Sequence, residues 1–230
     1  MAIADLRPAS NLATSPPVVR PDSSVRRTAR IVGVLFLAGF LAYGVGNLIA
    51  TGIVRSDDRS SSTALFVTGA ALMLLNSAFV IGIGALMLPI LRPHNEAIAA
   101  GYLATRIFEG VGLAIGVVSL IVLTSSDAIH ANAALYSVAE AGLGIGSLFF
   151  CALLFRAGLV PRFLAGWGFV GYACFVGGNL LALFGVAGAG LVGAIPGGLF
   201  ELTFGIWLIA RGFASTATVP SRVRTAVAPA

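Results

Sequence analysis

The sequence predicts an all-α, polytopic transmembrane protein, in which six membrane-spanning helices form one bundle and both termini are cytoplasmic. Composition is the first reason, because 58% of the 230 residues are hydrophobic and only 10% are charged, whereas a soluble domain carries about 25% charged residues. The second reason is that six apolar segments each have about the 20 residues that a helix needs to cross a hydrocarbon core. The third is that the connections are short, which makes consecutive helices antiparallel neighbours.

The predicted transmembrane domain occupies residues 28–213. Residues 1–27 are rich in Pro, Ser, Ala and Arg, so we expect a disordered cytoplasmic tail there and a second one over 214–230. Arg26-Arg27 is interpreted as the positive flank of a retained first helix, and the alternative is a cleaved twin-arginine export signal. The six helices are expected at 30–54, 64–91, 98–123, 133–155, 163–185 and 191–211.

Pro196-Gly197-Gly198 leaves the start of the sixth helix open. Proline is tolerated in the first turn of a helix, so this segment is one place where the helix can begin. The alternative is that the proline breaks the helix just before Glu201, as in transporters whose half-helices end at a binding site.

The arginines predict the orientation. All fourteen basic residues are arginines, and with the N-terminus inside only Arg55 and Arg59 fall in outer loops. Because cytoplasmic loops carry an excess of basic residues, both termini are expected to be cytoplasmic. The exclusive use of arginine indicates a GC-rich bacterial genome, and we therefore expect a bacterial inner (cell) membrane. The arginines punctuate apolar runs instead of forming one basic face, which argues against a nucleic-acid partner.

Polar side chains at membrane depth identify the candidate site. An ionisable residue there costs roughly 2.5–3.5 kcal/mol, so it normally has a partner or a function. Arg106 and Glu109 lie three residues apart and therefore on one side of the third helix. The other polar residues fall on stripes of small residues, a pattern typical of surfaces that face other helices. The predicted polar layer comprises Arg106, Glu109, Glu140, Glu201, Asn76, Tyr102 and Tyr136, with Asn47 and Asn179 nearer the outer leaflet.

The charges of this layer do not balance. One arginine faces three glutamates, and desolvation and like-charge repulsion both oppose a net charge of −2 inside the bundle. We expect Arg106 to neutralise one carboxylate and at least one other carboxyl to be neutral near pH 7. Such a group can exchange protons or bind a cation. The leading hypothesis is therefore a protein that binds or passes a small solute or protons.

Other functions stay open. One alternative is a structural, accessory or regulatory subunit, in which the only role of the Arg106–Glu109 pair is to hold helices together. A third is a membrane-embedded enzyme acting on a lipid or quinone. His94 and His130 are expected in loops on opposite sides of the membrane, so neither a zinc nor a haem site is predicted. We expect no cofactor or metal. The expected partner is the lipid bilayer, and a homo-oligomer or a further membrane partner is left open.

A weak internal repeat relates residues 30–50 to residues 162–182 without gaps. Gly46 then aligns with Gly178, and Asn47 aligns with Asn179. The repeat indicates either a duplicated or triplicated helical hairpin, or chance, since membrane helices use a small set of residue types.

Three motifs resemble one known family. They are Arg106-x-x-Glu109-Gly110, the segment from Phe200-Glu201-Leu202 to Trp207-Leu208 that ends with Arg211-Gly212, and the Arg30-x-x-Gly33 opening. Together they are similar to bacterial multi-pass membrane proteins catalogued as domain of unknown function 4386, over residues 26–213. The resemblance implies a six-helix integral protein of a bacterial plasma membrane and brings no known activity with it.

Overall fold

The computed structural model describes residues 23–56, 61–123 and 125–214. Within these ranges the chain forms six α-helices and no strand. All six helices are long and apolar enough to cross a membrane, which confirms the predicted all-α fold with six membrane-spanning helices. They are α1 (Ser23–Ser56), α2 (Thr63–Leu91), α3 (Glu96–Val122), α4 (Ser125–Ala157), α5 (Arg162–Leu183) and α6 (Ala189–Ala210).

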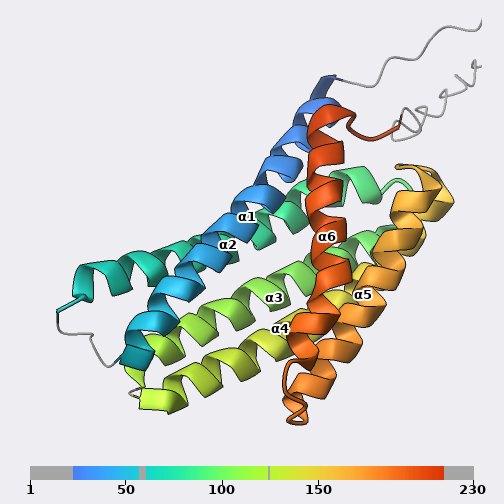
Figure 1. Ribbon diagram of the computed structural model, residues 1–230. Helices are drawn as coiled ribbons and strands as arrows, with labels where there is room; N and C mark the ends of the chain where they lie inside the picture. The colour runs from blue at the N-terminus through green and yellow to red at the C-terminus, as the bar shows by residue number, and fades with distance from the viewer. Residues whose placement is uncertain (1–22, 57–60, 124, 215–230) are drawn as a thin grey trace, which may run out of the picture.

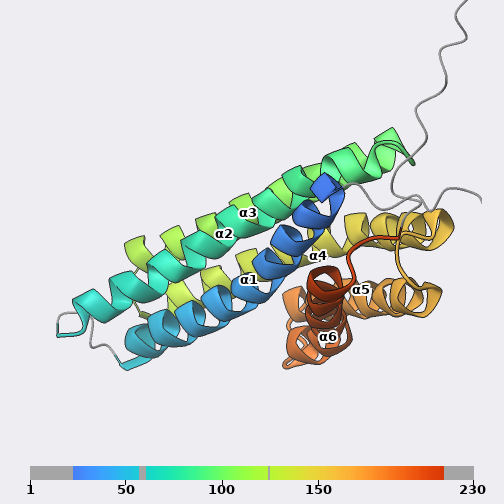
Figure 2. The same cartoon turned by 90° about the horizontal axis from the view of Figure 1, so that it is seen from above.

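The helices form a single bundle in chain order (Figures 1 and 2). Every helix packs against the next one, and α1 also packs against α6. The first residues of α1 and the last residues of α6 lie at the same end of the bundle, which we call the terminal end (Figure 1). The opposite end, where α1, α3 and α5 finish, is called the loop end. Figure 1 shows α1 and α6 close together at the terminal end and diverging toward the loop end.

Two helices begin earlier than the sequence predicts. α1 starts at Ser23 instead of residue 30, inside the segment expected to be a disordered tail, and α4 starts at Ser125 instead of residue 133. Both extra stretches are too polar to resemble a membrane span, yet each has a buried side. That side includes Ala29 in α1 and Ala128 in α4. Such packing, more than local preference, stabilises helical turns. His130, which was expected in a loop, therefore lies on α4.

The sixth helix neither begins at Pro196 nor breaks there. α6 is continuous from Ala189 to Ala210 and has Pro196 inside it, so both alternatives drawn from the sequence are wrong. The proline removes one backbone donor, and membrane helices tolerate this loss where neighbouring helices pack around it. A Cβ atom added to Gly171 of α5 would lie 3.0 Å from the Pro196 carbonyl oxygen. The α5 backbone therefore packs directly against this part of α6.

Glycines mark the closest approaches between helices. A Cβ atom at Gly33 would lie 2.5 Å from the Gly205 carbonyl oxygen, where α1 crosses α6. The repeat-related pair behaves alike, because Gly46 approaches the carbonyl oxygen of Gly69 in α2, and Gly178 approaches the Cα atom of Gly193 in α6. Each member of the aligned pair thus lets its helix pack closely on the helix that follows.

The buried apolar residues form two unequal clusters. The larger one lies toward the terminal end and receives side chains from all six helices, among them Phe36, Phe150 and Phe204. The smaller one lies toward the loop end and contains residues of α1–α4 only. Because α5 and α6 do not contribute to the second cluster, the bundle is less tightly filled there.

Candidate functional site

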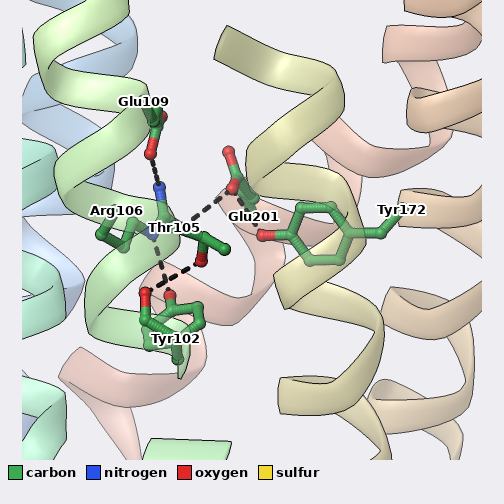
Figure 3. Close-up of polar contacts among 6 residues, drawn as sticks. All are labelled: Tyr102, Thr105, Arg106, Glu109, Tyr172 and Glu201. Atoms are coloured by element: carbon green, nitrogen blue, oxygen red, sulfur yellow. Dashed lines mark hydrogen bonds and ion pairs between the residues drawn. The ribbon is translucent and has the colours of Figure 1, made fainter. Parts of the chain in front are cut away.

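Arg106 is the centre of the predicted layer. Its side chain is only 2% exposed, and each guanidinium nitrogen has a partner (Figure 3). Nε donates to the Tyr102 hydroxyl at 3.0 Å, and Nη1 donates to Glu109 at 2.9 Å. Nη2 donates to Glu201 of α6 at 3.3 Å. The predicted pairing of Arg106 with Glu109 is therefore present, and a second carboxylate shares the same arginine.

The neighbouring helices make room for this arginine. A Cβ atom at Gly84 of α2 would lie 2.8 Å from the Cβ atom of Arg106, so a larger residue there would displace the side chain. The Phe36 ring of α1 lies with its centroid 5.1 Å from the guanidinium carbon, within the range of a cation–π interaction. Arg106 is thus enclosed by α1, α2, α3 and α6.

Glu201 has a second donor that the sequence did not assign to the layer. The Tyr172 hydroxyl of α5 donates to Glu201 Oε1 at 2.6 Å (Figure 3). Tyr172 is fully buried at 1% exposure. Its position in the stripe of Gly168, Tyr172, Phe175 and Asn179 was the only signal in the sequence, since that stripe predicts a helix-facing surface. The hydrogen bonds around Glu201 therefore connect α3, α5 and α6.

A cavity of about 210 Å³ adjoins this cluster and brings the rest of the predicted layer together. Its lining includes Asn76 of α2 and two residues of α4, Tyr136 and Glu140. Arg106, Glu109 and Glu201 line it as well. Glu140 is 6% exposed, and no hydrogen bond or ion pair joins it to another residue of the described ranges. The three intramembrane glutamates therefore differ, because two share Arg106 and one has no such partner.

A second cavity, of about 350 Å³, lies toward the loop end. Asn47 and Asn179 line it, as does Asn132 of α4. Asn132 is buried and was not predicted, because the fourth helix was expected to begin one residue later. The Asn179 amide donates to the Phe175 carbonyl at 2.9 Å, while its Oδ1 atom is buried and has no hydrogen-bond partner within the described part of the chain.

Two tyrosines lie between the cavities. Tyr43 of α1 and Tyr136 of α4 stack with ring centroids 5.3 Å apart and an interplanar angle of 28°. Both rings line the first cavity and the second one, and so does Ala194 of α6. The two cavities are therefore neighbours that share this wall.

On the other side of the ion-pair cluster, toward the terminal end, aromatic rings fill the bundle. Tyr102 stacks on Phe150 with centroids 4.2 Å apart, and Phe200 stacks on Phe204 at 5.4 Å. Phe150 and Phe204 meet edge-on at 5.9 Å. All four are at most 1% exposed. This aromatic layer separates the polar cluster from the terminal end.

The histidines and cysteines do not line the cavity of the polar layer. His94 is in the α2–α3 connection, where burial lowers its pKa, and His130 is exposed on α4. Cys151 is buried, Cys174 is exposed, and the two thiols are free. Over the described residues, no group of three or more His, Cys, Asp or Glu side chains is arranged to hold a metal ion.

A family model matches residues 31–212, which is most of the chain and includes the whole polar layer. The chain belongs to the family described as domain of unknown function (DUF4386). This confirms the resemblance carried by Arg106-x-x-Glu109-Gly110, and the family description assigns no activity. No curated protein and no solved structure matches the chain.

Proposed function

We propose that this DUF4386 protein binds a small solute or protons at its buried Arg/Glu/Asn layer and passes them through the bundle. The six apolar helices support an integral membrane protein, and the cavity beside Arg106 offers space for a ligand at the depth of the polar side chains. The family match covers these residues without assigning them a role.

The observation that carries the proposal is the state of Glu140. A buried charge without a partner is expensive, whereas the same group is tolerated when it is neutral or has a counter-ion. Arg106 already binds Glu109 and Glu201, so it does not supply that counter-ion. A proton or a bound cation would do so, and the cavity gives either one access to the carboxyl group.

The arginine distribution supports an orientation with the terminal end in the cytoplasm. Described arginines outside the membrane core gather at that end, and Arg55 alone among them is at the loop end, in the last turn of α1. Basic residues favour the cytoplasmic side. We infer the inner membrane of a bacterium as the location. The terminal-end arginines are Arg26, Arg27, Arg30, Arg92, Arg156, Arg162 and Arg211.

The test is flux in proteoliposomes that contain a pH-sensitive dye. Under an imposed pH gradient, the protein is expected to speed the change in internal pH, and Glu140→Gln is expected to abolish most of that increase. Glu96→Gln is the matched control, because Glu96 is an exposed acid at the start of α3, paired with Arg92. If flux is absent under all gradients, or is unchanged in Glu140→Gln, Glu109→Gln and Glu201→Gln, the passage of protons is wrong.

A second candidate is a structural or accessory subunit in which the polar cluster only holds helices together. The observation that favours it is that Arg106 and Tyr172 both bind Glu201 and so connect α3, α5 and α6. Under this candidate, replacing Arg106, Glu109 and Glu201 together by leucine restores the stability that Arg106→Leu alone removes. If the triple variant is folded but has lost flux, holding helices together is not the whole function of the cluster.

A further inference from the structure

We infer that the ligand of the 210 Å³ cavity is a small organic cation, an ammonium group with apolar substituents, held by Glu140 and the rings of Tyr43 and Tyr136. The inference rests on the proposed function and names the substrate class of the same site. Three features of the cavity carry it: the sign of its charge, the chemistry of its walls and its connection to the second cavity.

The charge of the cavity favours a cation over an anion. Glu109, Glu140 and Glu201 line it, against Arg106 alone. Each of the three nitrogens of Arg106 donates to a side chain of the protein, and two carboxylates share its single positive charge, so an anion would meet excess negative charge. Glu140, in contrast, is 6% exposed and has no hydrogen bond or ion pair to any other described residue. It is the group that gains most from a positive ligand.

The walls favour an organic cation over a metal ion. Phe36, Phe40, Tyr43, Tyr136 and Phe175 line the same cavity, and cations that carry apolar groups are bound by aromatic rings through cation–π attraction. Hard metal ions need six or more oxygen ligands, and in the described part of the chain the three glutamates of the lining are not grouped so that they could hold one. The size also agrees: an apolar cavity of about 150 Å³ holds benzene, and this one is about 210 Å³.

The second cavity supplies a polar approach to the site. It shares the wall of Tyr43, Tyr136 and Ala194 with the first cavity, and its lining includes Asn179, whose buried Oδ1 atom lacks a hydrogen-bond partner in the described part of the chain. An N–H donor of the ligand, or water that accompanies it, can satisfy this oxygen. The aromatic layer of Phe150, Phe200 and Phe204 closes the other direction. The ligand therefore reaches Glu140 from the loop end.

Three probes of nearly equal shape test the inference: benzylammonium, benzyl alcohol and benzoate. Each is titrated calorimetrically into the full-length protein in a nonionic detergent at neutral pH. Benzylammonium is expected to bind more tightly than benzyl alcohol by about tenfold or more, as for a desolvated charge pair, and benzoate is expected not to bind. Equal affinity for benzylammonium and benzyl alcohol, or preference for benzoate, would overturn the inference.

Variants locate the binding. Glu140→Gln is expected to weaken benzylammonium binding by about tenfold, while Glu96→Gln leaves it unchanged. Tyr136→Leu is expected to weaken it by about fivefold, and Tyr136→Phe, which keeps the ring, restores it. Ala194→Trp, in the shared wall, is expected to slow association. Benzylammonium binding that is insensitive to both Glu140→Gln and Tyr136→Leu places the probe elsewhere and contradicts the inference.

The outcomes separate this inference from the proposed function. If Glu140-dependent proton flux is measured but benzylammonium does not bind, the proposed function stands with protons as the species passed, and the organic cation is wrong. If neither flux nor binding of any probe is detected, both proposals fail. Binding of benzylammonium that competes with proton flux supports both.

Discussion

The two halves of this bundle are filled differently. Toward the terminal end all six helices meet, and aromatic rings pack between them with little exposure. Toward the loop end only α1–α4 share an apolar cluster, and a cavity of about 350 Å³ lies between α1, α4, α5 and α6. The charged layer lies at the boundary between these halves. The charged residues are therefore next to a cavity on one side and next to close packing on the other.

The three glutamates of the polar layer also differ in how closely their surroundings are packed. Glu109 and Glu201 bind Arg106 at the edge of the tightly packed half. Glu140 lines the cavity on the side of the stacked Tyr43 and Tyr136 rings and lacks such a partner within the described ranges. The three glutamates thus divide into two that pair with Arg106 and one that lines the cavity without such a partner in the described ranges.

The largest loss of stability is expected for Arg106→Leu, which removes the positive charge from the edge of the packed half. Glu109 and Glu201 would stay buried without it, and breaking a buried ion pair in this way costs about 3–5 kcal/mol. The measurement is thermal unfolding in detergent. Arg92→Leu is the control, because the exposed pair of Arg92 with Glu96 is worth about 0–1 kcal/mol. Similar losses in the two variants would show that the charged layer does not stabilise the packed half.

Two glycines of α1 test the closure of the terminal end. At Gly33 an added Cβ atom would lie 2.5 Å from the Gly205 carbonyl oxygen, whereas at Gly44 it would meet no atom within 4 Å. Gly33→Ala is therefore expected to force α1 away from α6 and to lower the free energy of unfolding by about 1–3 kcal/mol. Gly44→Ala is expected to leave it unchanged or to raise it slightly. The same unfolding assay compares them, and equal stability of the two variants would contradict a tight crossing.

The smallest effect on the fold is expected for a cysteine substitution that compares the access of water to the two halves. Cys151 is buried in the packed half, and Asn47 lines the loop-end cavity. Two single-cysteine proteins are compared: Asn47→Cys in a chain without Cys151 and Cys174, and Cys151 in a chain without Cys174. Asn47→Cys is expected to react with a cationic methanethiosulfonate reagent at least about tenfold faster than Cys151, since thiol reactivity follows access to water. Labelling is followed by mass spectrometry. Equal rates would mean that the loop-end half is as closed as the terminal-end half.

Much of the fold was predictable because it depends on composition. Six spans are visible in the sequence as long apolar segments, and the Arg106–Glu109 pair follows from their spacing on one helix. The starts of α1 and α4 were wrong, since their first turns are polar on average and are stabilised by one buried face that includes Ala29 and Ala128. The continuity of α6 through Pro196 was also missed, because packing against Gly171 is a property of two helices.

The sequence by itself therefore determined that this is a six-helix membrane protein with one arginine and three glutamates at depth. Only the tertiary structure decided that Glu201, and not Glu140, is the second carboxylate bound by the arginine. Glu201 is far along the chain from Arg106. The two side chains pair because α6 crosses α1 closely and presents Glu201 to α3. Hydropathy is a sum over the residues of one segment, whereas pairing between helices depends on how each helix is rotated and tilted. That geometry, set by close approaches such as Gly33 on Gly205, leaves Glu140 facing a cavity.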